Sequence, residues 1–268
     1  MKSIALLSVA SLVALSAFAT GCTITSTSSG SSGSSSSTQQ QPLHSSTVDV
    51  AQMRASMSAQ ASDTTVKIYA SLFADDGSTG NRGVVLDTGD YFTAQIGNGE
   101  PVVLTMEPLE SSDIVHYTAT LPAPADAADV TIALVRPAGK IGAPSSVVHL
   151  PAPFRFTTTP PVSVHAGDTL EVGLDPAPDG YVEIEASGAC VDADSSTNDW
   201  FQATNADGSV DVHTSLAFVS GKSAGCDVSF YVSSIDEGTL DPAFAGGISG
   251  IFDVEGIQKR GFDVSVLR

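Results

Sequence analysis

Residues 65–72 read Thr-Val-Lys-Ile-Tyr-Ala-Ser-Leu, and this stretch decides the fold class. Its apolar side chains recur at every second position, which is the period of a strand. Because successive side chains of a strand point to opposite faces, one face is apolar and the other is mostly polar. We therefore predict a half-buried strand. The residues on its apolar face are Val66, Ile68, Ala70 and Leu72.

The same alternation recurs along the first half of the folded part. It predicts strands at residues 91–96, 102–106, 114–121, 130–135 and 146–150, with Gly-, Asp- and Pro-rich turns between them. Residues 50–61 fit both a helix and a strand, and their β surroundings favour a strand. About seven short strands at spacings of roughly 8–12 residues are typical of a β-sandwich.

The stretch Leu150-Pro151-Ala152-Pro153 interrupts this pattern. Proline cannot donate to a β-ladder, so the stretch predicts a hinge. The alternation then restarts at residues 154–158, 169–173, 181–187, 200–204, 210–213, 215–219, 228–233, 248–254 and 261–267. The sequence thus predicts an all-β chain with two tandem antiparallel β-sandwich domains, at residues 48–150 and 151–268.

This layout resembles the immunoglobulin-like and fibronectin-III-like modules of bacterial surface proteins. The resemblance concerns architecture alone. Trp200 lies between Cys190 and Cys226, but behind a polar loop, so the Cys-Trp-Cys core of antibody domains is not clearly met. A shared fold does not give a function.

The first residues carry the marks of an export signal. Lys2 precedes an apolar run at residues 4–19, and small residues follow before Cys22. The run is shorter than the roughly 20 residues that a helix needs to cross a bilayer. We therefore predict a cleaved signal peptide at residues 1–21 rather than a permanent transmembrane helix.

Ala19-Thr20-Gly21-Cys22 resembles the lipobox of bacterial lipoproteins, with Ala19 where Leu is most common. The resemblance implies cleavage between Gly21 and Cys22, and a diacylglycerol thioether and an acyl group such as palmitate on Cys22. Thr23, which is not Asp, resembles the outer-membrane sorting class. The resemblance therefore implies export and lipid anchoring to the cell envelope, at the outer membrane. Ordinary secretion, with a free thiol at Cys22, is the alternative.

Residues 22–47 are rich in Ser, Thr, Gly and Gln. This composition offers little apolar surface to bury and predicts a disordered tether. About 25 residues of this kind span roughly 25–30 Å. The folded part is thereby expected to stand away from the membrane.

The chain is strongly acidic, with 11 basic and 30 acidic residues and a net charge of −19. Losing Lys2 with the signal would leave ten basic residues against 30 acidic ones, or about −20. Such a charge disfavours phosphate backbones, so we expect no nucleic-acid partner. The expected partners are the membrane, through lipid on Cys22, and a protein or glycan that the sequence does not identify.

Two cysteines remain after Cys22. Cys190 and Cys226 are an even pair in a chain predicted to be exported, which favours a disulfide between them. A two-cysteine metal site is the alternative, but the close spacing of zinc ligands is absent from the sequence.

Catalytic motifs are missing from the sequence. It contains no nucleophile elbow, zinc-protease helix, dinucleotide fingerprint or P-loop, and its histidines show no metal spacing. His165 and Asp168 could form an acid–base couple, although their surroundings indicate a turn. We expect a non-enzymatic protein without a cofactor, which displays its domains for binding or for envelope structure. A hydrolase with a site built from distant loops is a weaker alternative.

One loop could bind calcium. Asp192, Asp194 and Asp199 supply hard oxygen ligands, but the loop lacks the Gly and Glu of an EF-hand, so a solvated acidic loop is favoured. An exposed Trp200 beside this loop would suit glycan binding, whereas the high average burial of Trp favours core packing. The alternative function is therefore a glycan- or calcium-binding module.

Overall fold

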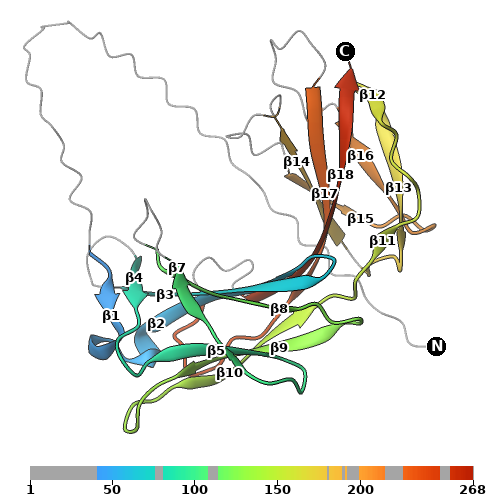
Figure 1. Cartoon of the computed structure of the whole chain (residues 1–268). Helices are drawn as coiled ribbons and strands as arrows, with labels where there is room; N and C mark the ends of the chain where they lie inside the picture. The colour runs from blue at the N-terminus through green and yellow to red at the C-terminus, as the bar shows by residue number, and fades with distance from the viewer. Residues whose placement is uncertain are drawn as a thin grey trace, which may run out of the picture. The chain divides into compact units, whose positions relative to one another are not determined.

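β-Strands make up nearly all the regular structure of the chain (Figure 1). The computed structural model describes residues 41–75, 81–107, 114–179, 181–188, 191, 199–214, 226–247 and 254–267, all in one compact unit. The two helices in these ranges are short 3₁₀ turns, Ser45–Thr47 (η1) and Val50–Gln52 (η2). The predicted all-β class is confirmed.

The strands before Pro151 follow the predicted alternation closely. Tyr91–Ile96 has the predicted bounds, and residues 50–61 form a strand after one 3₁₀ turn. The strands are β1 (Leu43–His44), β2 (Met53–Ala61), β3 (Thr65–Asp75), β4 (Asn81–Val85), β5 (Tyr91–Ile96), β6 (Val102–Val103), β7 (Thr105–Glu107), β8 (His116–Pro122), β9 (Ala128–Val135) and β10 (Ala143–Leu150).

The last two strands after Pro151, β17 and β18, are long. The predicted strand at residues 215–219 and most of the one at 248–254 lie outside the described residues. The strands are β11 (Arg155–Phe156), β12 (Ser163–His165), β13 (Thr169–Asp175), β14 (Tyr181–Gly188), β15 (Asp199–Ala203), β16 (Ser209–His213), β17 (Cys226–Glu237) and β18 (Val254–Leu267).

The largest sheet joins strands from both sides of Pro151. Its main path runs β1-β4-β3-β2-β18-β17-β14-β15, with β8 added on β3, β7 on β8 and β12 on β18. A four-stranded sheet has the order β10-β9-β5-β6, and a three-stranded sheet has the order β11-β13-β16. β18 pairs antiparallel with β17 and parallel with β2. Strands that the sequence assigns to different domains therefore lie side by side.

Two hydrophobic clusters hold these sheets together. The first gathers the buried faces of β2, β3, β5, β9 and β10, together with Phe244 and Val254 from the C-terminal part of the chain. The second gathers those of β13, β14, β16 and β17 with Val264 and Val266 of β18. β18 is 14 residues long and thus contributes to both clusters.

β10 approaches β17 and β18 closely at two glycines. A Cβ on Gly256 would lie 1.9 Å from the carbonyl oxygen of His149, and one on Gly238 would lie 2.3 Å from that of Val147. Thr239 and Val147 exchange two backbone hydrogen bonds of 2.7 and 2.8 Å beside this point. The glycines are therefore needed for the contact between the backbones.

The predicted tether is too long at its C-terminal end. Leu43–His44 form β1, which pairs parallel with β4, and Ser45 is fully buried. Composition could not reveal this, because the polar groups of this segment are satisfied by side chains far away in the sequence.

Candidate functional site

Most of the predicted site residues cannot be placed. Gly21, Cys22, Cys190, Asp192 and Asp194 lie outside the described residues. The lipid site, the cleavage site and most of the calcium loop therefore stay predictions.

The remaining predicted site residues are described in part. Asp199 and Trp200 begin β15, where Trp200 pairs with Ile184, but their side chains are outside the description. Phe201, the next residue, is 56% exposed. Cys226 begins β17 and is partly buried, while its predicted partner is not described, so the disulfide also stays a prediction.

The structure places two of the histidines in structural roles. The backbone N–H of His165 donates to Asp168 Oδ2 at 2.8 Å, and Asp168 N–H donates to the carbonyl oxygen of His165 at 3.1 Å, as in the predicted turn. His116 Nδ1 lies 2.6 Å from the hydroxyl of Ser71 on the neighbouring strand. Within the described ranges, no group of three or more His, Cys, Asp or Glu residues could hold a metal ion.

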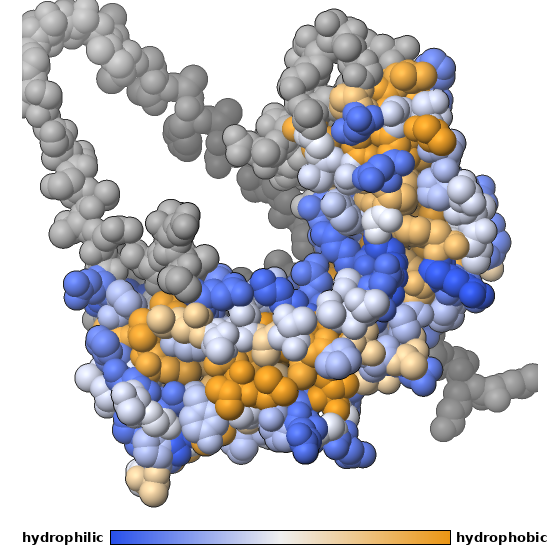
Figure 2. Space-filling view, in the orientation of Figure 1, coloured by the Kyte–Doolittle hydropathy of each residue, from blue (hydrophilic) through white to orange (hydrophobic). Residues whose placement is uncertain are grey.

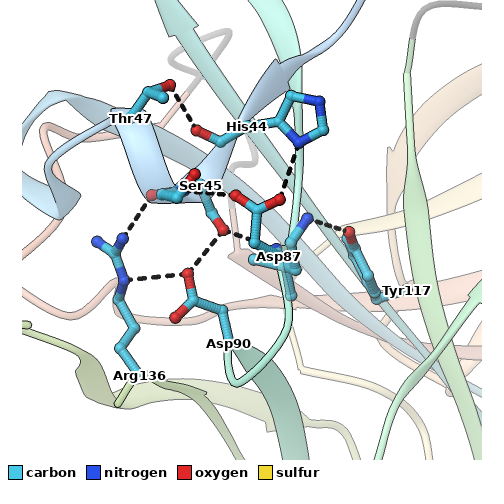
Figure 3. A network of polar contacts seen from close by, with 9 residues as sticks. His44, Ser45, Thr47, Asp87, Asp90, Tyr117 and Arg136 are labelled. Carbon is cyan, nitrogen blue, oxygen red and sulfur yellow. Dashed lines mark hydrogen bonds and ion pairs between the residues drawn. The ribbon is translucent and has the colours of Figure 1, made fainter. Parts of the chain in front are cut away.

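A buried polar network attaches the segment that follows the tether to the fold (Figure 3). At its centre Arg136 Nε lies 3.4 Å from Asp90 Oδ2, and the two side chains are 3% and 1% exposed. Arg136 also donates to the backbone carbonyls of Ser45 at 2.5 Å and Val48 at 3.3 Å. An arginine from the end of β9 thereby binds the entering chain by its backbone.

Ser45 completes the attachment from the other side. Its hydroxyl donates to Asp90 Oδ2 at 2.6 Å and accepts the backbone N–H of Asp87 at 2.9 Å. Ser45 is fully buried, and no histidine in the network contacts its hydroxyl as a base would. The hydrogen bonds of this hydroxyl hold the entering segment in place.

Asp87 links the same segment at the surface. Ser46 donates its backbone N–H to Asp87 Oδ2 at 2.8 Å, and His44 Nδ1 lies 2.9 Å from Asp87 Oδ1. Hydrogen bonds from Ser46, and then from His44, lower the pKa of Asp87 from 3.8 to about 2. This carboxylate is therefore charged at neutral pH, as the contacts require.

A second charged region surrounds a cavity of about 630 Å³. Its lining comes from the end of β2, the β2–β3 turn, β3, β11, β17 and β18, so it forms where β18 passes between neighbouring elements. Four cationic side chains line this basic pocket, and they are half of the eight Lys and Arg residues in the described part of the chain. They are Lys67, Arg155, Lys259 and Arg260.

Each cation of the basic pocket has an acidic neighbour. Arg155 Nη2 lies 2.7 Å from Asp175 Oδ2, and Arg260 Nε lies 3.0 Å from Asp63 Oδ1. Lys67 Nζ lies 3.6 Å from Glu107, and Lys259 is paired with Glu185. Among the described residues that line the cavity, Asp63 is the one acidic residue, so the other three carboxylates flank the pocket rather than line it.

Aromatic rings accompany the cations. Lys259 Nζ lies 4.4 Å from the ring centre of Tyr231, and Lys67 Nζ lies 4.8 Å from that of Tyr69. The hydrogen bond with Tyr69, followed by the charges of Tyr69 and Glu107, raises the pKa of Lys67 above its usual 10.5. Each of these two lysines therefore lies beside an aromatic ring.

Gly261 sets the position of one of these rings. It is paired with Tyr231 across the β17–β18 ladder, and a Cβ at residue 261 would lie 2.8 Å from two ring carbons of Tyr231. Phe156 packs edge-on against Phe262 with the ring centres 5.4 Å apart. The pocket thus combines positive charge with flat apolar surface.

Apolar surface also occurs away from the pocket. Val102 and Val103 on β6 are exposed, and Figure 2 shows apolar residues over the four-stranded sheet that carries β5 and β9. Nothing in the described structure covers this surface.

Comparisons with known proteins give no identity. Neither the models of known protein families nor the curated protein sequences contain a match to this chain. None of the helices formed by the described residues is long and apolar enough to span a bilayer.

Proposed function

We propose that this protein is an exported lipoprotein, cleaved before Cys22 and lipidated there, which presents an all-β body at the cell envelope for binding rather than catalysis. The signal-like residues 1–21 and the lipobox-like residues before Cys22 support export and lipidation. Stable anchoring takes more than one acyl chain, and the modification of this class supplies two or three on one cysteine.

The attachment network is the structural observation that supports this proposal most. The chain enters the fold directly after the Ser-rich stretch, and the buried pair of Arg136 and Asp90 binds it at Ser45 and Val48. Tension on a lipid anchor would pass along the tether to this point. A buried ion pair and the pairing of β1 with β4 would carry it into the largest sheet.

Mass spectrometry of the N-terminus tests the anchor. The parent protein should begin at Cys22 and carry the mass of the diacylglycerol and the amide-linked acyl group, whereas Cys22→Ala should carry neither. Cys226→Ala is the matched control and should keep the lipid, because it changes a cysteine outside the lipobox. A parent chain that is cleaved but unlipidated would contradict the proposal.

We also propose the disulfide between Cys190 and Cys226 as part of this exported protein. Gly188 of β14 is paired antiparallel with Val228 of β17. Cys190 follows Gly188 by two residues and Cys226 precedes Val228 by two, so the two cysteines come on the same side of this pair in the sequence. Peptide mapping without reduction should recover one linked peptide containing both residues. Free thiols at both positions in protein purified from the cell envelope would contradict the proposal.

The alternative module for glycan or calcium stays a proposal of lower rank. It depends on Trp200 and the loop of Asp192, Asp194 and Asp199, whose side chains are not described. A rise in melting temperature at millimolar Ca²⁺, lost in Asp194→Asn, would favour it over a plain acidic loop.

A further inference from the structure

The basic pocket is not explained by anchoring or by the sheet topology. We propose that it binds an acidic saccharide, meaning a sugar ring that carries a carboxylate. This inference goes beyond the proposed function and does not depend on the lipid at Cys22.

The charge of the pocket is the first argument. The whole chain has a net charge of −19, yet four cations and a single acidic residue line this cavity among the described residues. Salt screens the repulsion from distant carboxylates beyond about 8 Å, so the side chains at the pocket decide what it attracts. Each of the four cations lies beside one carboxylate, so a ligand anion would bind by taking the place of that carboxylate.

Two of the four ion pairs at the pocket leave their cations well exposed, whereas Lys259 and Arg260 are 25% and 14% exposed. Arg155 is 80% exposed and its partner Asp175 is 51% exposed, while Lys67 and Glu107 are 42% and 49% exposed. Pairs at such exposure contribute little stability, so a ligand carboxylate can compete for the cation. The planar guanidinium of Arg155 also suits two-point binding of a carboxylate.

The remaining lining favours a sugar over a bare anion. Tyr231, whose ring lies against Gly261, offers a flat surface next to Lys259, and Phe156 adds a second aromatic side chain. Gln60, Ser62 and Thr65 place amide and hydroxyl groups in the same lining, which can pair with sugar hydroxyls. A cavity of about 630 Å³ has the size of a small-molecule site.

Titration calorimetry on the full chain in detergent micelles tests this proposal. The probes are a trimer of galacturonic acid, the neutral galactose trimer of the same length and inorganic phosphate. We expect saturable binding of the acidic trimer, at least tenfold weaker binding of the other two probes, and weaker binding at higher salt.

Three charge variants localise the binding. Lys259→Gln and Arg155→Gln should each weaken binding of the acidic trimer by about ten- to a hundredfold, because each removes a charge-assisted contact. Lys140→Gln removes the same charge from an exposed turn outside the pocket and should change affinity by less than twofold. Unchanged melting temperatures will show that the variants are folded.

Four outcomes would overturn the proposal. They are no saturable binding of the acidic trimer by the parent protein, equal affinity for the neutral trimer, equal affinity for inorganic phosphate, and an equal loss of affinity in Lys140→Gln.

Discussion

Two regions of this protein contain the same kinds of ion pair at very different exposure. In the attachment network, Arg136 and Asp90 are almost completely buried, and the arginine also binds backbone carbonyls. In the basic pocket, Arg155 and Asp175 are largely in solvent. A buried charge that loses its partner destabilises the protein, whereas an exposed charge is stabilised by water. The first pair is therefore needed for folding, and the cation of the second pair is available to a ligand.

Removing the buried arginine should have the largest effect. Arg136→Met leaves Asp90 buried without its cation and frees the carbonyls of Ser45 and Val48, so the free energy of unfolding should fall by about 3–5 kcal/mol. Urea denaturation followed by circular dichroism measures this. Asp90→Leu combined with Arg136→Met should recover part of the loss, because no charge is then left buried. If Arg136→Met lowers the free energy of unfolding by less than about 1 kcal/mol, the buried and exposed ion pairs do not differ in their contribution to stability.

Closing the gap beside β10 should have an intermediate effect. Gly256→Ala places a Cβ against the carbonyl oxygen of His149, so the strands must separate, at a cost of about 1–3 kcal/mol. The same denaturation experiment checks it, with Ser58→Ala on the paired strand as a control. An unchanged urea midpoint would contradict the close contact between the backbones of β10 and β18.

The pH dependence of the attachment follows from Asp87. Its pKa is about 2 in the folded protein and 3.8 ordinarily, so the carboxylate stabilises the fold above about pH 4 and this contribution is lost as the pH falls toward 2. The protection factor of the Ser46 amide against hydrogen exchange should fall in that window. In Asp87→Asn the protection should no longer vary there, and a parent-like acid transition in this variant would assign the effect to another group.

The exposed pair should have the smallest effect on stability. Arg155→Gln should change the free energy of unfolding by less than about 1 kcal/mol, since Arg155 and Asp175 are mostly solvated. Chemical denaturation at two salt concentrations measures it. A loss as large as that of Arg136→Met would make the pocket arginine a structural residue.

The sequence predicted the strands well where one face is buried. Residues 65–70 of β3 and 91–94 of β5 alternate regularly, and the buried residues of both stretches are in the first hydrophobic cluster. The order of the sheets was not predictable in the same way. β18 pairs with β2, almost 200 residues earlier, and local alternation carries no information about such a partner.

The missed features depend on contacts between distant residues. Ser45 looks like part of the tether in the sequence, and its burial depends on Asp90 and Arg136. The polar residues 258–260 separate two predicted strands, yet they continue β18, because β17 pairs with them throughout. Two of these three residues, Lys259 and Arg260, line the basic pocket, so the interruption in the apolar pattern was the available signal for the site.

The most direct test measures stability and ligand affinity together in Arg136→Met and Arg155→Gln, at a temperature where both variants are folded. We predict that Arg136→Met lowers the free energy of unfolding by several kcal/mol but binds the acidic trimer within twofold of the parent affinity. Arg155→Gln should keep its stability within about 1 kcal/mol and lose at least tenfold in affinity. If both variants lose stability and affinity to the same extent, the two regions are not separate and the account is wrong.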